Sequence, residues 1–96
     1  MRKVLKNTAR TEKRLKKLRK LYAVCFWAKW TIVEVPWSGK YDKEDNPLVY
    51  IYFDFNGEFD EYRLMKINHV SCCFYDWYDD RSHAECVVNM LNSKKD

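Results

Sequence analysis

The chain has 96 residues, enough for one domain and too few for two hydrophobic cores, so we take residues 1–96 as a single domain. Its longest nearly apolar run, Leu21–Ala28, is far shorter than the roughly 20 residues that cross a bilayer. A helix lying on a membrane surface would need a broader apolar face than the basic segment offers, so we expect no contact with a membrane. We also expect a cytoplasmic location, where the four Cys are free thiols.

The charges are strongly divided along the sequence, behind a formal net charge of only +4. Residues 1–40 hold twelve Lys and Arg against two acids, whereas residues 41–93 hold four against eleven. Such a division points to charged partners and carries no information about the fold.

The first predicted element is a helix over residues 8–28. Leu15, Leu18, Tyr22 and Cys25 recur at steps of three and four, which places them on one face of a helix. Residues 1–7 are expected to form a frayed basic tail before it.

Three or four strands are predicted next. Residues 30–35 form a strand that ends at Pro36, and residues 38–46 form a polar loop. Residues 48–55 have apolar side chains on both faces, which indicates a central strand. Asn56-Gly57 is a strong turn signal leading into a strand over residues 58–67, with the register left open because a bulge would shift it by one. Residues 70–75 are a candidate fourth strand, after a tight turn at Asn68-His69.

A second helix is predicted over residues 79–92. Ser82 and Glu85 have the spacing of a capping box, and the buried stripe is expected to be Ala84, Val87, Val88 and Leu91. The fold class is therefore α+β: an N-terminal helix, an antiparallel meander of three or four strands and a C-terminal helix, an αβββα-like order.

The basic helix is the first candidate site, for nucleic-acid phosphates or an acidic partner. The alternative is an ordinary solvated helix face. The predicted contact residues are Lys13, Arg14, Lys16, Lys17, Arg19 and Lys20.

An acidic, aromatic face is the second candidate, as a protein-partner surface that imitates a phosphate backbone and offers tyrosine anchors. The alternative is that these acids guard an exposed hairpin against edge pairing. The predicted residues are Asp42, Glu44, Asp45, Asp54, Glu58, Asp60, Glu61, Tyr41 and Tyr52.

Metal and catalytic sites have weak support. Zinc sites usually combine paired Cys or His units, and no such pair of units occurs around Cys72, Cys73, His69 or the His83/Cys86 pair. No phosphate-cradling glycine loop and no local signature of a nucleophile occurs. We expect no metal, no cofactor and no enzymatic activity, and keep a small zinc-binding structural domain as an alternative.

The order of helix, three strands and helix resembles the double-stranded-RNA-binding domain over about residues 8–92, which implies an αβββα fold. That family carries its basic residues at the start of the second helix. Here that position holds Asp79, Asp80 and Ser82, with Arg81 as its one basic residue.

The general profile resembles small inhibitors from phages and mobile elements, including anti-CRISPR proteins: short, divided in charge and free of catalytic motifs. This resemblance implies a non-enzymatic protein that binds a nucleic-acid-processing protein or its nucleic acid and blocks it. A direct RNA- or DNA-binding module using the basic helix is the alternative. A homodimer, joining a basic helix to an acidic hairpin, is left open.

Overall fold

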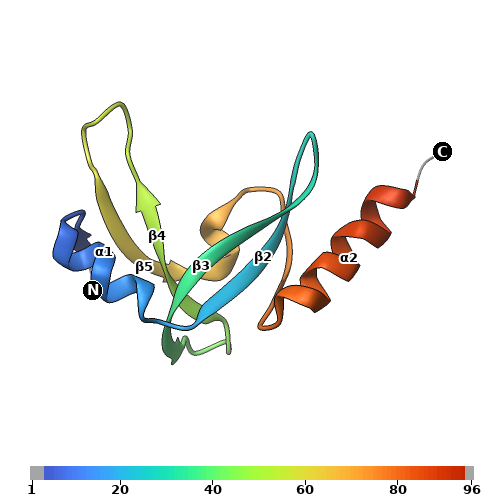
Figure 1. Ribbon diagram of the computed structural model, residues 1–96, viewed down its shortest axis with the longest axis horizontal. Coiled ribbons are helices and arrows are strands. Elements are labelled where there is room, and N and C mark those ends of the chain that lie inside the picture. The colour runs from blue at the N-terminus through green and yellow to red at the C-terminus, as the bar shows by residue number, and fades with distance from the viewer. Residues whose placement is uncertain (1–3, 95–96) are drawn as a thin grey trace.

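The computed structural model describes residues 4–94 as an α+β protein with a six-stranded antiparallel sheet (Figure 1). The sheet order is β1-β5-β4-β3-β2-β6. The elements are β1 (Val4–Lys6), α1 (Ala9–Lys16), β2 (Lys20–Trp27), β3 (Lys29–Tyr41), β4 (Pro47–Phe53), β5 (Glu61–Lys66), the 3₁₀-helix η1 (Ile67–Val70), β6 (Phe74–Tyr78) and α2 (Arg81–Ser93).

Strand β3 joins two hairpin arms that diverge from each other (Figure 1). It pairs with β2 from Lys29 to Pro36, and its bridges to β4 are at Trp37 and Tyr41. The N–H of Trp37 donates to the carbonyl of Arg19, just before β2. Because successive backbone nitrogens of a strand point to opposite edges, the nitrogen of Pro36 points away from β2, toward the β4 side. Proline has no N–H to offer a ladder, and Pro36 lies where β3 changes partners.

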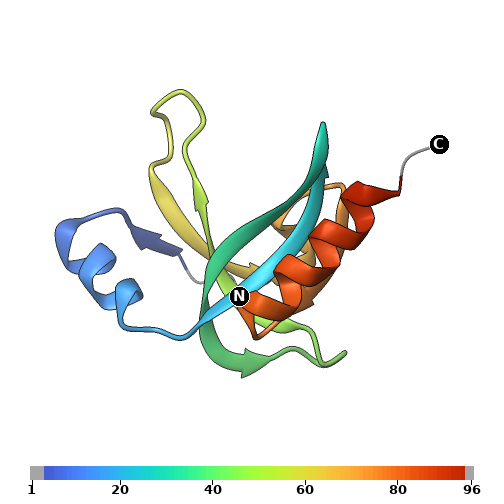
Figure 2. The same ribbon diagram turned by 45° about the vertical axis from the view of Figure 1, so that its right-hand side comes forward.

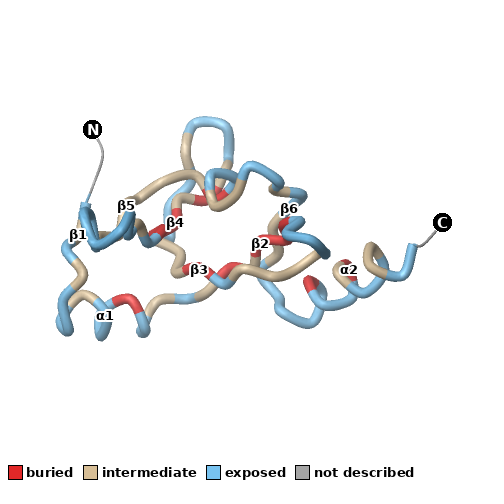
Figure 3. Tube along the Cα trace, turned by 90° about the horizontal axis from the view of Figure 1, so that it is seen from above, coloured by how far each residue is buried: buried red, intermediate tan, exposed pale blue. Residues whose placement is uncertain are grey.

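The core lies between the two arms. Leu21, Ala23 and Cys25 of β2 form one buried cluster with Val49 of β4 and Ile67 of η1. All five are almost fully buried, whereas α1 and the hairpin tips are largely exposed (Figure 3).

Helix α2 covers β2 and β3 on the side away from this core (Figure 2). Of the four side chains predicted for its buried stripe, Ala84 and Val87 are buried, whereas Val88 and Leu91 are half-buried. Val24 of β2 is directed to this face because it alternates with Ala23 and Cys25. The N-cap is Asp80, whose carboxylate accepts from the Ser82 N–H at 2.9 Å, so the predicted capping box at Ser82 is wrong.

The predicted αβββα order is wrong at the N-terminus. The helix expected over residues 8–28 ends at Lys16, and residues 20–27 form β2. Leu21–Trp27 is rich in aromatic and other large apolar side chains, and both faces of β2 are covered, so tertiary pairing decides its structure. Residues 4–6 of the predicted frayed tail pair with β5, while residues 1–3 lie outside the described residues.

The middle strands are predicted better, although the strands expected over residues 48–55 and 58–67 end at Phe53 and start at Glu61, because residues 54–60 form the turn. Strand β3 continues through Pro36 to Tyr41, because Trp37 and Tyr41 pair with β4, so the predicted loop shrinks to the turn after Tyr41. Strand β4 is central, as predicted. A two-residue loop at Asn56-Gly57 would pair Phe53 with Asp60, but Phe53 lies opposite Glu61. The register is therefore shifted by one residue, and the positive φ of Asp60 accommodates this shift.

The last predicted strand is displaced. Residues 67–70 form η1 in place of the predicted tight turn, and β6 starts at Phe74 where it pairs with β2. The sheet therefore has more strands than the three or four predicted, because β1 and β2 were not foreseen as strands.

Candidate functional site

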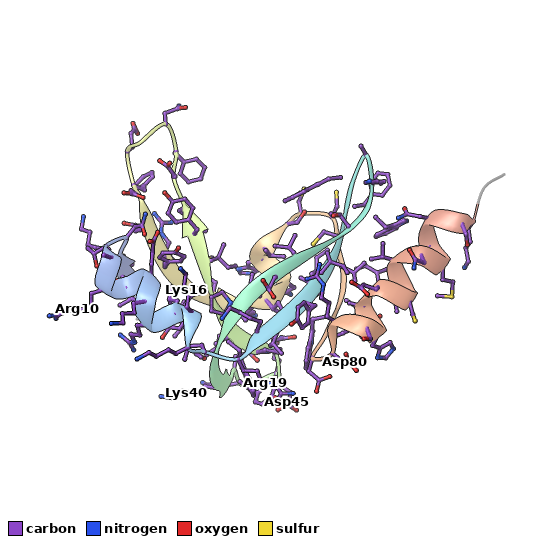
Figure 4. All side chains as sticks on the ribbon, in the orientation of Figure 1. Arg10, Lys16, Arg19, Lys40, Asp45 and Asp80 are labelled. Atoms are coloured by element: carbon purple, nitrogen blue, oxygen red, sulfur yellow. The ribbon has the colours of Figure 1, made fainter. Side chains whose placement is uncertain are left out.

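Helix α1 presents a group of cations, here called the α1 cations: Lys13, Arg14, Lys16 and Lys17. The helix starts at Thr8, whose hydroxyl accepts from the Thr11 N–H, and Leu15 is its one buried side chain. The α1 cations are all exposed, and among residues 4–94 none of them forms an ion pair. In Figure 4, Arg10 points outward from α1, whereas Lys16 lies on the side of the helix toward the β4–β5 hairpin.

The other two cations predicted for this site have partners within the chain. The Lys20 ammonium donates to the carbonyls of Leu15, Lys16 and Leu18, at 3.1, 3.3 and 2.8 Å, and so caps the carboxyl end of α1. The guanidinium of Arg19 lies 3.4 Å from the Asp79 carboxylate in an exposed pair, which adds little to stability. Of the six predicted cations, the four α1 cations are therefore available to a ligand, whereas Lys20 and Arg19 are engaged within the chain.

The predicted acidic face is not a single cluster. Asp42, Glu44 and Asp45 lie in the turn between β3 and β4, while residues 54–61 lie at the other end of β4 (Figures 1 and 4). At roughly 3.3 Å per residue, β4 separates the two groups by about 20 Å. The topology therefore splits this predicted site into two.

In the β3–β4 turn, the acids are bound locally. The Asp42 carboxylate accepts from the N–H groups of Glu44 and Asn46, each at 2.8 Å, and lies 3.8 Å from the Lys66 ammonium. The pKa of Asp42 is lowered from its ordinary value, and the largest cause is the hydrogen bond from the Asn46 N–H. Glu44 also pairs with Lys66, at 3.2 Å. Among the described residues, Asp45 is the one acid of this turn without a side-chain partner.

At the β4–β5 tip, most acids again have partners. The Tyr52 hydroxyl and the Asn7 amide both donate to Asp60, and the bond from Tyr52 is the main cause that lowers the pKa of Asp60. The same bond raises the pKa of Tyr52. The carboxylate of Glu61 lies 2.6 Å from Arg63, and Asp54 accepts from the Gly57 N–H. Within residues 4–94, the Glu58 side chain has no partner.

The two predicted tyrosine anchors lie near opposite ends of β4. Tyr41 contacts Trp37, with ring centroids 5.4 Å apart, near the β3–β4 turn. Tyr52 lies beside Tyr62, with centroids 5.2 Å apart, on the α1 side of the β4–β5 hairpin. The structure therefore brings Tyr52, but not Tyr41, near the basic helix.

A groove that the sequence did not reveal runs from α1 into the gap between β3 and β4. Its helix side is a pocket of about 400 Å³ and its strand side one of about 420 Å³, and Lys20, Pro36 and Tyr62 line both. We call the two pockets together the α1–β4 groove. The one sequence signal for it is Pro36, because the groove opens where β3 leaves β4.

Exposed aromatic side chains gather at both hairpin tips, which lie on the same side of the molecule (Figure 2). At the β2–β3 tip, Trp27 is 56% exposed, and the ring of Trp30 contacts those of Phe26 and Tyr75. At the β4–β5 tip, Phe55 is 58% exposed. Large exposed apolar side chains of this kind are typical of interaction surfaces when they are contiguous.

The thiols and imidazoles are scattered. Cys25 is buried, which raises the pKa of its thiol, while Cys72 and Cys73 are exposed neighbours with sulfur atoms 3.8 Å apart. The His83 ring packs on Tyr78, 4.6 Å between centroids. Within residues 4–94, no three side chains of His, Cys, Asp or Glu are close enough together to hold a metal ion.

Neither described helix has the length and apolar character needed to cross a bilayer. Comparison of the chain with protein-family models, with curated proteins and with solved structures gives no match. The functional argument therefore depends on the α1 cations, the α1–β4 groove and the two aromatic tips.

Proposed function

We propose that this chain is a small non-enzymatic binding protein that holds nucleic acid through the α1 cations. The supporting observation is an asymmetry between charges. The α1 cations are exposed and have no ion pair among residues 4–94, whereas five of the seven predicted acids are engaged within the chain. Phosphates that meet this helix displace only counterions and water, and release of counterions favours binding.

Binding of this kind blocks a nucleic-acid-processing protein when both compete for the same nucleic acid. No catalytic step is needed for such an effect, because occupancy of the phosphates alone excludes the competitor. This mode keeps the inhibitor function expected from the sequence and assigns the contact to the basic helix.

The test is a titration of the protein against labelled single- and double-stranded DNA and RNA at low and moderate salt. We expect binding that weakens steeply with salt, by a slope of about 0.7–0.9 per neutralised phosphate on logarithmic axes. The triple variant Lys13→Glu, Arg14→Glu, Lys17→Glu is expected to abolish it. Lys20 is left unchanged in this variant because its ammonium caps α1.

The matched control is Lys29→Glu, Lys43→Glu, Lys94→Glu, which changes the net charge by the same amount at exposed positions away from α1. Retained binding in the control would assign the contact to the helix. Equal losses in both variants would reduce the effect to net charge, and no binding by the unaltered protein at low salt would contradict the proposal.

A second candidate is direct binding to a nucleic-acid-processing protein, and the exposed aromatic tips favour it. Trp27 and Phe55 are both more than half exposed on the same side of the molecule. Large, stiff aromatic side chains are common anchors at protein interfaces. Phe26→Ser with Phe55→Ser is expected to abolish co-elution with such a partner and to leave binding to nucleic acid unchanged, because both side chains are exposed and neither lines the α1–β4 groove. Trp27 is kept in this variant because it lines the strand-side pocket.

A further inference from the structure

The α1–β4 groove exists because the sheet is split. Tyr50, Ile51 and Tyr52 pair with β5, and the bridges between β4 and β3 lie below them, at Val49 and Pro47. Beyond those bridges the two strands separate, and side chains from both line the strand-side pocket, including Val35 of β3. A sheet that continued pairing would have closed this space.

Two neighbouring tyrosines, Tyr52 and Tyr62, line the groove. Tyr62 lines both pockets, and Tyr52 lines the strand-side pocket while 44% exposed. The Tyr52 hydroxyl donates to Asp60, which Asn7 also contacts at 2.8 Å. The Tyr52 ring is therefore held in place before any ligand arrives, which lowers the entropy lost on binding.

Charged side chains of both signs line the groove. Lys16, one of the exposed α1 cations, lines the helix-side pocket. Two carboxylates also line the groove, Glu12 on the helix side and Glu34 on the strand side. A phosphate is attracted to Lys16 and repelled by Glu12 and Glu34, whereas a base amino group is a suitable donor to a carboxylate.

From this arrangement we infer that the α1–β4 groove binds single-stranded nucleic acid, with bases stacked on Tyr52 and Tyr62 and phosphates along α1. Aromatic platforms beside a basic track bind single strands, because an unpaired base has a free face to stack. A base inside a duplex already has neighbours on both faces. This inference rests on the proposed function and adds the class of nucleic acid and the stacking residues.

The experiment compares a labelled mixed-sequence single strand with the same strand annealed to its complement, by fluorescence anisotropy. We expect the unaltered protein to prefer the single strand. Tyr52→Leu with Tyr62→Leu is expected to weaken single-strand binding about tenfold or more, since each stacked base contributes on the order of 1–3 kcal/mol. Duplex binding is expected to change by less than about twofold, because phosphate contacts remain.

Two further variants control for structure. Tyr52→Phe keeps the ring and loses the hydroxyl, so it is expected to retain most of the single-strand affinity. Tyr75→Leu alters an aromatic side chain of similar exposure on β6, away from the groove, and is expected to have no effect. If the double variant fails to fold, Tyr52→Leu alone is expected to weaken single-strand binding severalfold.

The outcomes separate the two proposals. Unchanged single-strand affinity in folded leucine variants overturns the groove inference, and the proposed function stands if the α1 triple reversal still abolishes binding. A preference for the duplex also overturns the groove inference. Absence of any binding at low salt overturns both proposals.

Discussion

The side-chain amide of Asn92 in α2 forms hydrogen bonds with both backbone polar groups of Trp30 in β3. Its side-chain oxygen accepts from the Trp30 N–H at 2.9 Å, and its side-chain nitrogen donates to the Trp30 carbonyl at 3.0 Å. One side chain thereby satisfies both backbone groups of a strand residue and ties the end of α2 to the β2–β3 arm.

Replacing this amide is expected to destabilise the protein. Asn92→Ala leaves both Trp30 groups without their partner in a partly buried setting, at a cost of about 1–3 kcal/mol. Urea denaturation followed by tryptophan fluorescence measures this loss. Asn89→Ala, at an exposed position one turn earlier, is the matched control and is expected to change stability by less than about 0.5 kcal/mol.

Lys20→Met is expected to weaken α1. The ammonium contacts the carbonyls of Leu15 and Leu18 at 3.1 and 2.8 Å, and methionine keeps the aliphatic stem but not these bonds. We expect a loss of about 1 kcal/mol and faster amide hydrogen exchange in the last turn of the helix. Lys17→Met removes an exposed charge next to the same helix end, and equal exchange rates in the two variants would refute the capping role.

Turn geometry gives a pair of predictions of opposite sign. Ala28 has φ 62° at the β2–β3 tip and Gly57 has φ 78° at the β4–β5 tip. Ala28→Gly is expected to stabilise the protein by roughly 0.5–1 kcal/mol, because an L side chain is strained there. Gly57→Ala is expected to destabilise it by roughly 1 kcal/mol through conformation alone, since a new Cβ would meet nothing within 4 Å. Changes of the same sign in thermal denaturation would contradict this explanation.

Acid is expected to loosen the β3–β4 turn. The Asn46 and Glu44 N–H groups lower the pKa of Asp42 from its ordinary 3.8, so below that value the unfolded chain binds more protons than the folded one. The stabilisation is therefore present above about pH 4 and is lost as the pH falls through the folded-state pKa. Asp42→Asn keeps an acceptor oxygen without the titration. Urea midpoints between pH 2 and 6 should fall less in this variant, and parallel curves would exclude Asp42 as a source of acid sensitivity.

Elements bounded by local start and stop signals were predictable. Strand β4 has two alternating apolar sets and lies between two partners, and α2 has Ala84 and Val87 on one stripe after an acidic start. Strand β2 was not predictable in this way. Because both of its faces are covered, its apolar residues show no alternation and also satisfy the helical spacing of Tyr22 and Cys25.

The candidate site was predictable only residue by residue. The α1 cations are visible as a charge run, but the capping role of Lys20 depends on the chain turning at Leu18 into a strand. The division between Asp42 and Asp60 depends on which end of β4 each one follows. The groove depends on where β3 changes partners. Pro36 indicates that position in the sequence, but no sequence signal places Tyr52 and Tyr62 beside it.

The break in the sheet at Pro36 also bears on self-association. A gap between two strands exposes unpaired backbone groups. A strand from a second copy of the chain can pair with such groups, and sheets grow into aggregates in this way. On the β3 side of this gap, Pro36 has no N–H and Glu34 is exposed and charged. Proline and charge are the features that natural edge strands use against such pairing. We therefore expect the gap to remain open to ligands and to be a poor template for fibre growth.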